Sequence, residues 1–414
     1  MTRAGSAAPD VAGVGEDRIA DRAEVLVVGA GPAGAVTALL LARWGAHVVL
    51  VQDAAGGAGR PIVGEVLPPA ARAAFARLGL ERCLGAPVHG LVPGTVAAWG
   101  PGEPVITDHV RSPGGEAVQL DRSTFEHDLL RAARAAGTRL VGRPRATWGA
   151  WAMAPERGGR RTPQVLVDAT GRAAMLARAG GATITRADRL VAVVGVLGAP
   201  GVLGAPGVRE RSRPGSAMPG PVERRLLVAA EHDGWWSSMV LPDGRRIAAL
   251  HADHDALDPS LRTDPAAWLA RLRTAPVVGP VVHAEAWAAP AALRVVAADS
   301  RRLPGSVPGR ADATRAGRPI LAVGDAEMAF DPLSSFGILG AISSAEEAVV
   351  VIRAMLDGRG GAGGPVATDA VATRAAARDA RWVRYRERLA LAYADEPRWP
   401  DAPFWMRRRP DPGG

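Results

Sequence analysis

The sequence contains no lysine, because all 50 of its basic residues are arginine. Phosphate-binding loops of the Walker type and pyridoxal phosphate enzymes both need a lysine, so both classes are excluded. The single cysteine, Cys83, excludes an internal disulfide and a metal site built on several cysteines. The eight histidines form no metal-ligand spacing, and we interpret His251 and His254 as solvated surface residues.

Composition and charge indicate a folded protein of 414 residues, of which 48% are hydrophobic and 22% charged. Arginine is spread along the chain without an RNA-binding pattern or a zinc finger, so we expect no nucleic acid partner despite the net charge of +8. The polar start lacks the apolar core of a signal peptide, and the two longest uncharged stretches are broken by glycine and proline. We therefore expect a cytoplasmic protein without a membrane partner.

The chain begins with a predicted flexible tail, residues 1–22. A β-branched run at 24–29 ends in glycine and is followed by a helical stretch at 35–44 and a second apolar run at 47–51, which together predict a β-α-β unit. Further elements predicted in this style are helices at 123–137 and 337–355 and strands at 164–167 and 319–323.

Between residues 186 and 300 the pattern changes to short strands and turns, which predicts a mainly antiparallel sheet. The expected strands are 189–197, 225–230, 236–241 and 246–251, with a helix near 265–273. A glycine-rich linker at 358–364 leads to a helical segment near 366–394. The arginine-rich end from Arg381 to Arg409 is interpreted as a solvated helix face and tail, with the docking of an acidic partner as the alternative.

A GxGxxG pattern lies between the first predicted strand and the first predicted helix. This strand–turn–helix context distinguishes a dinucleotide-binding motif from a chance run of glycines. Gly29 makes the tight turn, Gly31 lets the backbone approach a pyrophosphate, and Gly34, after Ala33, lets the helix pack on the strand. Phosphate oxygens then face the helix N-terminus, so the pattern predicts a dinucleotide site.

The second strand is expected to end at an acidic residue that holds a ribose. Gln52 stands at that position and Asp53 follows one residue later. Either the strand ends later than expected, or Gln52 makes a neutral contact instead.

More distant motifs indicate FAD. Gly324-Asp325-Ala326 follows the strand at 319–323, and the run 331–337 (DPLSSFG) begins six residues after Asp325. Together with 168–172 (DATGR) and Arg122, these motifs make the chain resemble flavin-dependent monooxygenases of the p-hydroxybenzoate hydroxylase fold, which include the flavin-dependent halogenases.

The resemblance implies how FAD is held. Asp325 would bond the ribityl chain, 168–172 would lie near the flavin phosphates, and Pro332 and Gly337 would lie against the isoalloxazine ring at a helix start, where the helix N-terminus stabilises the anionic reduced flavin. The candidate cofactor-binding residues are Gly29, Gly31, Ala33, Gly34, Gln52, Asp53, Arg122, Asp168, Gly171, Asp325, Gly337 and Ile338.

Two segments resemble the halogenase-like branch: 64–69 (GEVLPP), and Gly234-Trp235-Trp236 with Leu241-Pro242. Combined with 331–335 (DPLSS), they look most like the maturation flavoproteins of quinone-cofactor amine oxidases and dehydrogenases, which act on a tryptophan in a protein or peptide. The candidate catalytic residues are Glu65, Asp331, Pro332, Ser335 and Gly337, and the candidate substrate residues are Trp235, Trp236 and Phe336.

The resemblance implies a flavin C4a-hydroperoxide, whose distal oxygen is attacked by an electron-rich ring in hydroxylases and by a halide in halogenases. Halogenases relay the oxidised halide through a lysine and commonly carry a glutamate where this chain has Ser334, so this chain lacks both groups. We therefore predict an FAD-dependent monooxygenase of a biosynthetic or cofactor-maturation pathway that hydroxylates an electron-rich aromatic, with a tryptophan or indole side chain in a peptide or protein as the sharpest form.

Other functions stay open from the sequence. A small or carrier-bound aromatic substrate competes with the peptide, and a halogenase, a saturase of the geranylgeranyl reductase type or a non-catalytic FAD scaffold are further alternatives. The electrons come either from NAD(P)H, used by the chain itself, or from a separate flavin reductase.

The predicted fold class is α/β, α+β overall. It comprises a Rossmann-like FAD-binding domain, an inserted antiparallel-sheet substrate domain and a C-terminal helical segment. The boundaries are 23–80, 115–185 and 315–357 for the first domain, 81–114 and 186–314 for the second, and 365–414 for the C-terminal segment and tail.

Overall fold

The computed structural model describes most of the chain in ten ranges: 23–55, 66–85, 87–109, 112, 114–152, 163–198, 223–285, 287–303, 318–357 and 364–409. Several sequence predictions lie outside these residues. They are the flexible tail at 1–22, Glu65 and most of the linker at 358–364.

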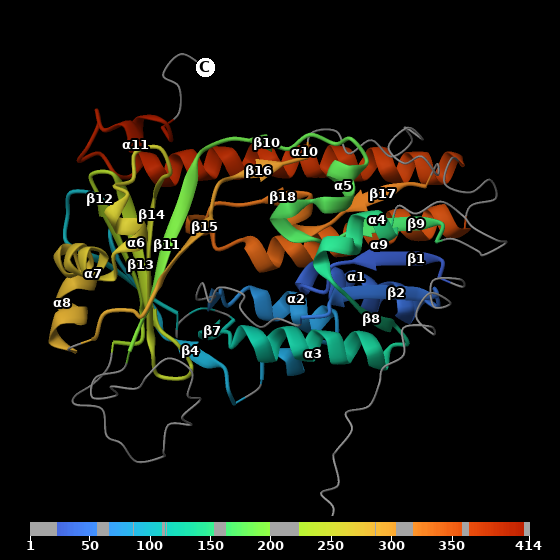
Figure 1. Cartoon of the computed structure of the whole chain (residues 1–414), viewed down its shortest axis with the longest axis horizontal. Helices are drawn as coiled ribbons and strands as arrows, with labels where there is room; N and C mark the ends of the chain where they lie inside the picture. The colour runs from blue at the N-terminus through green and yellow to red at the C-terminus, as the bar shows by residue number, and fades with distance from the viewer. Residues whose placement is uncertain are drawn as a thin grey trace, which may run out of the picture.

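A five-stranded parallel sheet forms one half of the molecule (Figure 1). Its order is β17 (Ile320–Ala322), β9 (Val165–Asp168), β1 (Val25–Val28), β2 (Val48–Asp53) and β8 (Arg139–Arg143). The β-branched strands are buried on both faces, as expected for parallel strands between helices. One face packs on helices α1 (Pro32–Trp44) and α9 (Gly337–Asp357), and the other packs on α4 (Trp148–Ala152) and α5 (Met175–Ala179).

A seven-stranded sheet forms the other half, and all its neighbours are antiparallel except the pair β12 and β5. Its order is β15 (Leu293–Ala297), β11 (Leu190–Leu197), β14 (Arg246–Asp253), β13 (Gly234–Val240), β12 (Leu226–Glu231), β5 (Gly94–Ala98) and β6 (Val105–Asp108). One face packs on helices α7 (Pro265–Thr274) and α8 (Val278–Ala284), and the opposite face packs on the C-terminal segment.

Two small antiparallel sheets complete the β-structure. The first contains β3 (Val66–Leu67), β7 (Ala117–Gln119) and β4 (Gly90–Val92); the second contains β10 (Thr185–Arg186), β16 (Arg301–Arg302) and β18 (Met328–Ala329). Helices α2 (Ala71–Arg77) and α3 (Arg122–Ala135) pack against α1 and the first half of α9.

Helix α10 (Pro365–Ala394) is 30 residues long and runs along the molecule from the five-stranded sheet to the seven-stranded sheet (Figure 1). Near its start, Arg374 donates to the carbonyl of Ala322 at the end of β17 and forms a buried ion pair of 2.8 Å with Glu327. Near its end, the same helix reaches the sheet face that carries Trp235. The helix therefore connects the two halves.

The mixed α/β fold predicted from the sequence is confirmed, and the expected strands and long helices are found within a few residues of their predicted ends. The domain boundaries drawn from the sequence remain a prediction. Among the helices within the described ranges, none has the length and apolar character needed to cross a membrane.

Two interpretations of surface residues are wrong. His251 is buried and stacks on Trp235 with ring centroids 3.6 Å apart, and burial lowers its pKa to about 3. The arginine-rich end is not simply a solvated face, because Arg408 is buried against Asp253 and Arg381 pairs with Glu347 of α9. In both places, long-range packing provides partners that lie far away in the sequence.

The buried ion pair between Glu327 and Arg374 generates a stability prediction. Neither carboxylate oxygen of Glu327 has a well-aligned hydrogen-bond donor among the described residues, so the guanidinium acts mainly through its charge. Arg374→Met should lower the free energy of unfolding by about 3–5 kcal/mol, measured by chemical denaturation, because it leaves a buried charge uncompensated. Combining Arg374→Met with Glu327→Leu should recover most of the loss, and equal losses in the single and double variants would contradict this account.

Candidate functional site

Three sequence motifs meet beyond the carboxyl ends of β1, β9 and β17, at contacts that leave no room for a side chain. A Cβ atom on Gly29, whose φ is +107°, would lie 2.1 Å from the carbonyl oxygen of Ala169. A Cβ on Gly34 would lie 1.9 Å from the carbonyl oxygen of Gly29, and one on Gly324 would lie 2.7 Å from the Cβ of Ala33. The glycine motif and the middle motif are therefore packed backbone against backbone, and Gly324 of the GDA motif is packed against the methyl group of Ala33.

Two other glycines of the motifs face open space. A Cβ on Gly31, which precedes α1, would meet no atom within 4 Å, and the same is true of Gly337 at the start of α9. Pro332 and Ser335 are exposed beside Gly337. This arrangement fits FAD, with room for a pyrophosphate at the N-terminus of α1 and for a flat ring against the turn before α9.

Asp325 lies in the one-turn helix η5 (Gly324–Ala326), where the amide of Gly324 donates to Ser344 Oγ over 2.7 Å. Its side chain is 40% exposed, and its Oδ2 lies 3.7 Å from Nε of Arg172. Burial of its surroundings raises the pKa of Asp325, while the charges of Arg172 and Arg122 lower it. Asp325 therefore lies close to Arg172 of the middle motif, and the binding of FAD by Asp325 and Arg122 remains a prediction.

Asp168 is buried and serves the loop of the middle motif. Its carboxylate accepts hydrogen bonds from the amide and hydroxyl of Thr170 and from the amide of Ala177, at 3.0, 2.7 and 2.8 Å. Burial raises its pKa, and these donors oppose the shift. We therefore propose that Asp168 shapes the loop and that Gly171, with a φ of +68°, completes its turn.

The second strand, β2, ends one residue later than expected from the sequence. The strand extends to Asp53, so Asp53 and not Gln52 is its last residue. The Asp53 carboxylate accepts a hydrogen bond from the amide of Ala55 over 3.1 Å. Contact of either side chain with a ribose remains a prediction.

The turn before α9 is held by Asp331, which precedes the one-turn helix η6 (Pro332–Ser334). Its Oδ1 accepts from the amide of Leu333 over 2.9 Å. Ser335 has a φ of +50°, a conformation that is costly for a residue other than glycine and is concentrated at functional sites. Phe336 packs edge-on against Phe330, with centroids 5.1 Å apart.

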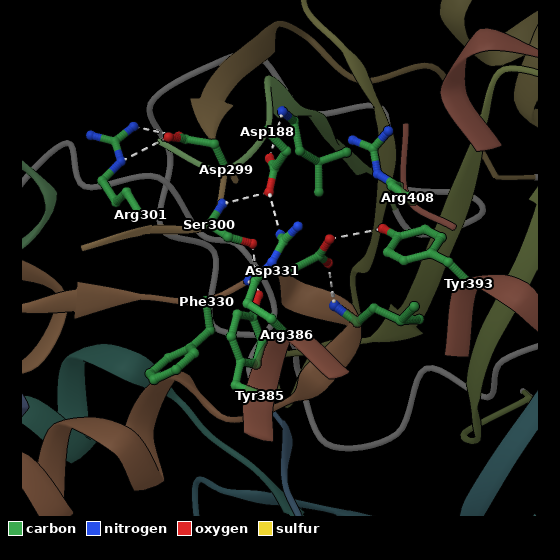
Figure 2. A network of polar contacts seen from close by, with 12 residues as sticks. Asp188, Asp299, Ser300, Arg301, Phe330, Asp331, Tyr385, Arg386, Tyr393 and Arg408 are labelled. Carbon is green, nitrogen blue, oxygen red and sulfur yellow. Dashed lines mark hydrogen bonds and ion pairs between the residues drawn. The ribbon is translucent and has the colours of Figure 1, made fainter. Parts of the chain in front are cut away.

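The only two tyrosines of the chain both lie in α10 and both bind Asp331 (Figure 2). Tyr393 donates its hydroxyl hydrogen to Asp331 Oδ2 over 2.8 Å, and the amide of Asp331 donates to the hydroxyl of Tyr385 over 2.7 Å. The Tyr385 hydroxyl is also hydrogen-bonded to Ser300 Oγ at 2.7 Å. Asp331 is 1% exposed, and burial raises its pKa to about 6 against the two donors to its carboxylate.

Sequence reasoning missed both tyrosines. A usable signal existed, because they are the only two in the sequence and lie eight residues apart on one predicted helix. Their partners on other elements could not be read from that spacing. The geometry assigns Asp331 to holding the turn, since the described contacts of its carboxylate go to Leu333 and Tyr393.

Trp235 and Trp236 are buried on opposite faces of the seven-stranded sheet. Trp236 packs on Trp268 of α7, away from the flavin motifs. Trp235 lies in the same cluster as Phe330 and Phe336, and its Nε1 donates to the hydroxyl of Tyr393 over 3.1 Å. Of the two, only Trp235 therefore lies on the side of the predicted flavin ring.

The FAD binding domain family matches residues 22–143 of this chain. LodB, a protein of Marinomonas mediterranea described as an FAD-dependent oxidoreductase, is 25% identical over 403 residues, which cover 93% of this chain and 96% of LodB. These matches include the strand, glycine motif and helix of the first β-α-β unit.

Solved structures of flavoenzymes have the same fold. The peptidyl tryptophan dihydroxylase QhpG, essential for tryptophylquinone cofactor biogenesis, is 25% identical and has a TM-score of 0.67; the likeness covers 94% of this chain and 78% of QhpG. The flavin-dependent halogenase CmlS is 21% identical with a TM-score of 0.70 and covers 94% and 68% of the two chains. The likeness to CmlS shows the fold alone.

A single methyl group at Gly31 tests where the cofactor lies. Gly31→Ala should leave the melting temperature of the apoprotein unchanged, because the new Cβ meets open space and the φ of −73° suits alanine. FAD affinity, measured by fluorescence titration, should fall by about tenfold or more, because the backbone approaches the pyrophosphate there. The matched control is Gly102→Ala in the loop before β6, which also meets open space and should bind FAD normally. Unchanged affinity in Gly31→Ala would contradict the placement.

The raised pKa of Asp331 predicts a pH dependence of stability. Between its ordinary value of 3.8 and about 6, the unfolded chain releases the proton while the folded protein retains it, so the free energy of unfolding falls as pH rises. Asp331→Asn removes this decline, which is on the order of 3 kcal/mol, and keeps an oxygen for Tyr393. Chemical denaturation of both proteins across this range should show the difference growing in favour of the variant, and a constant difference would rule out the titration.

The sequence matches, the shared fold and the geometry beyond the parallel strands agree on the cofactor and on the kind of enzyme. Open space lies at Gly31 and at Gly337. These are the positions at which the sequence motifs predict the pyrophosphate and the flavin ring. The chain is an FAD-dependent oxidoreductase with the fold shared by flavin monooxygenases and flavin-dependent halogenases.

Proposed function

We propose that this oxidoreductase hydroxylates a tryptophan side chain that is part of a peptide or protein. The observation that carries the proposal is the likeness to the peptidyl tryptophan dihydroxylase QhpG, which extends over 94% of this chain at 25% identity. An indole ring is electron-rich, so oxygen transfer to it needs little help from a catalytic base. This agrees with a site whose acid, Asp331, is engaged in holding a turn.

The residues of this chain position the reaction. FAD, when bound and reduced, would supply the activation of dioxygen. Gly31 would let the backbone approach the phosphates, Gly34 packs the first helix against Gly29, and the N-terminus of α9 at Gly337 would stabilise negative charge on a reduced ring. Asp331 fixes that helix start from behind, and Phe336 adds an apolar side chain that excludes water beside the exposed Pro332.

Halogenation has less support from the residues. The chain has no lysine to relay an oxidised halide. Ser334, at the position where the resemblance to halogenases expects a glutamate, donates its hydroxyl to the carbonyl of Asp331 over 2.7 Å and so belongs to the turn. We propose the oxygen-transfer reaction on this ground.

Oxygen-18 labelling tests the proposal. The FAD-loaded protein is supplied with reduced FAD, oxygen-18 gas, bromide and a peptide whose one tryptophan can be replaced by phenylalanine. Mass spectrometry should show labelled oxygen on the tryptophan peptide and none on the phenylalanine peptide. The control protein is Gly31→Ala, in which the product should fall together with FAD occupancy.

The outcomes separate the alternatives. A brominated peptide without labelled oxygen would identify a halogenase and overturn the proposal. Labelled oxygen on free indole or a small phenol, but on no tryptophan peptide, would support a monooxygenase while contradicting the peptide substrate.

A further inference from the structure

A cavity lies beside the middle motif. Its volume is about 790 Å³, and it is formed by the one-turn helix η4 (Gly171–Ala173), by α5 and the segment that follows it, and by β10 and β16. Four arginines line it, namely Arg172, Arg178, Arg186 and Arg301. Among the described residues, no acidic side chain lines the cavity, and no residue of the glycine motif or the GDA motif does.

The carboxylates near these arginines are too few to neutralise them. Asp299 is shared: Arg301 donates to both of its oxygens, Arg172 lies 3.4 Å away and Arg186 lies 3.8 Å away. Asp325 approaches Arg172 over 3.7 Å. Two carboxylates therefore oppose four guanidinium groups, and the cavity keeps a positive potential.

The two arginines at the rim are suited to close on a ligand. The side chain of Arg186 is 66% exposed, and Arg178 is also exposed. Arg172 and Arg301 are fixed instead, because they donate to the carbonyl oxygens of Asp299 and Arg172 respectively. A pair of fixed guanidinium groups with two exposed ones resembles other sites that recognise oxyanions through forked hydrogen bonds.

We propose that this cavity binds a small molecule that carries a phosphate group. The four guanidinium groups exceed the two carboxylates by two positive charges. A phosphate with two negative charges would neutralise this excess, whereas a single carboxylate would neutralise only one of the two charges. The volume lies within the range of ligand pockets and leaves room for more than the phosphate itself. None of the described residues that line the cavity belongs to the glycine motif at Gly31, but Arg172 belongs to the middle motif, which the resemblance places near the flavin phosphates. The cavity therefore adjoins the predicted FAD site on the side away from the glycine motif.

The cavity is connected to the flavin motifs by hydrogen bonds. Arg172 donates to the carbonyl of Phe330 over 3.1 Å. Between Asp299 and Arg301, Ser300 bonds Tyr385, which accepts from the amide of Asp331 (Figure 2). A ligand bound to Arg172 or Arg301 would therefore be connected through these hydrogen bonds to the turn beside the predicted flavin ring.

Calorimetry with inorganic pyrophosphate tests the site in the FAD-loaded protein. Arg178→Ala with Arg186→Ala should weaken pyrophosphate binding by at least about tenfold, since each removes a charge-assisted contact. The matched control is Arg273→Ala with Arg384→Ala, which removes the same charge from exposed positions of α7 and α10 outside the cavity and should bind as the unchanged protein does. Citrate, titrated in parallel, represents carboxylate ligands.

Three results would overturn the inference. Equal weakening in both double variants would show general attraction to a basic protein. Binding of citrate without binding of pyrophosphate would contradict the phosphate. Release of FAD in step with pyrophosphate binding, followed by flavin fluorescence, would show that the arginines serve the phosphates of the flavin itself.

Discussion

The structure depends on three close contacts of glycines, two of them with backbone and the third with the methyl group of Ala33. Gly29 lies against Ala169, Gly34 lies against Gly29, and Gly324 lies against Ala33, at separations that a Cβ would shorten to between 1.9 and 2.7 Å. These contacts set how close the first helix, the middle motif and the GDA motif come to each other. The open space at Gly31 and Gly337 can receive the pyrophosphate and the flavin ring only because these contacts fix the surrounding segments.

The C-terminal helix α10 holds the turn before α9 in place. Asp331 is held by both tyrosines of α10, and Tyr393 also accepts from Trp235 of the seven-stranded sheet. Because one helix reaches both the end of β17, through Arg374, and this turn, the two halves of the molecule are coupled where the flavin ring is expected. Hydrogen-bond networks of this kind in a buried setting rigidify their members.

Motifs with local geometry were predictable from the sequence. The glycine motif requires a strand, a tight turn and a helix in succession, and each is set by residues within thirty positions of Gly29. The burial of His251 was not predictable, because its stacking partner Trp235 comes from the neighbouring strand. Likewise, no local pattern pairs Arg408 with Asp253, so the arginine-rich end was misread as solvated. Long-range partners depend on strand order and helix packing, which one sequence leaves open.

The placement of the flavin underlies the whole account, and a crystal structure of the FAD complex tests it most directly. We expect pyrophosphate density within hydrogen-bond reach of the backbone at Gly31–Gly34, the ribityl chain at Asp325 and the ring against Pro332–Gly337. Density for the ring away from that turn, or for phosphates in the arginine-lined cavity instead of at the start of α1, would contradict it.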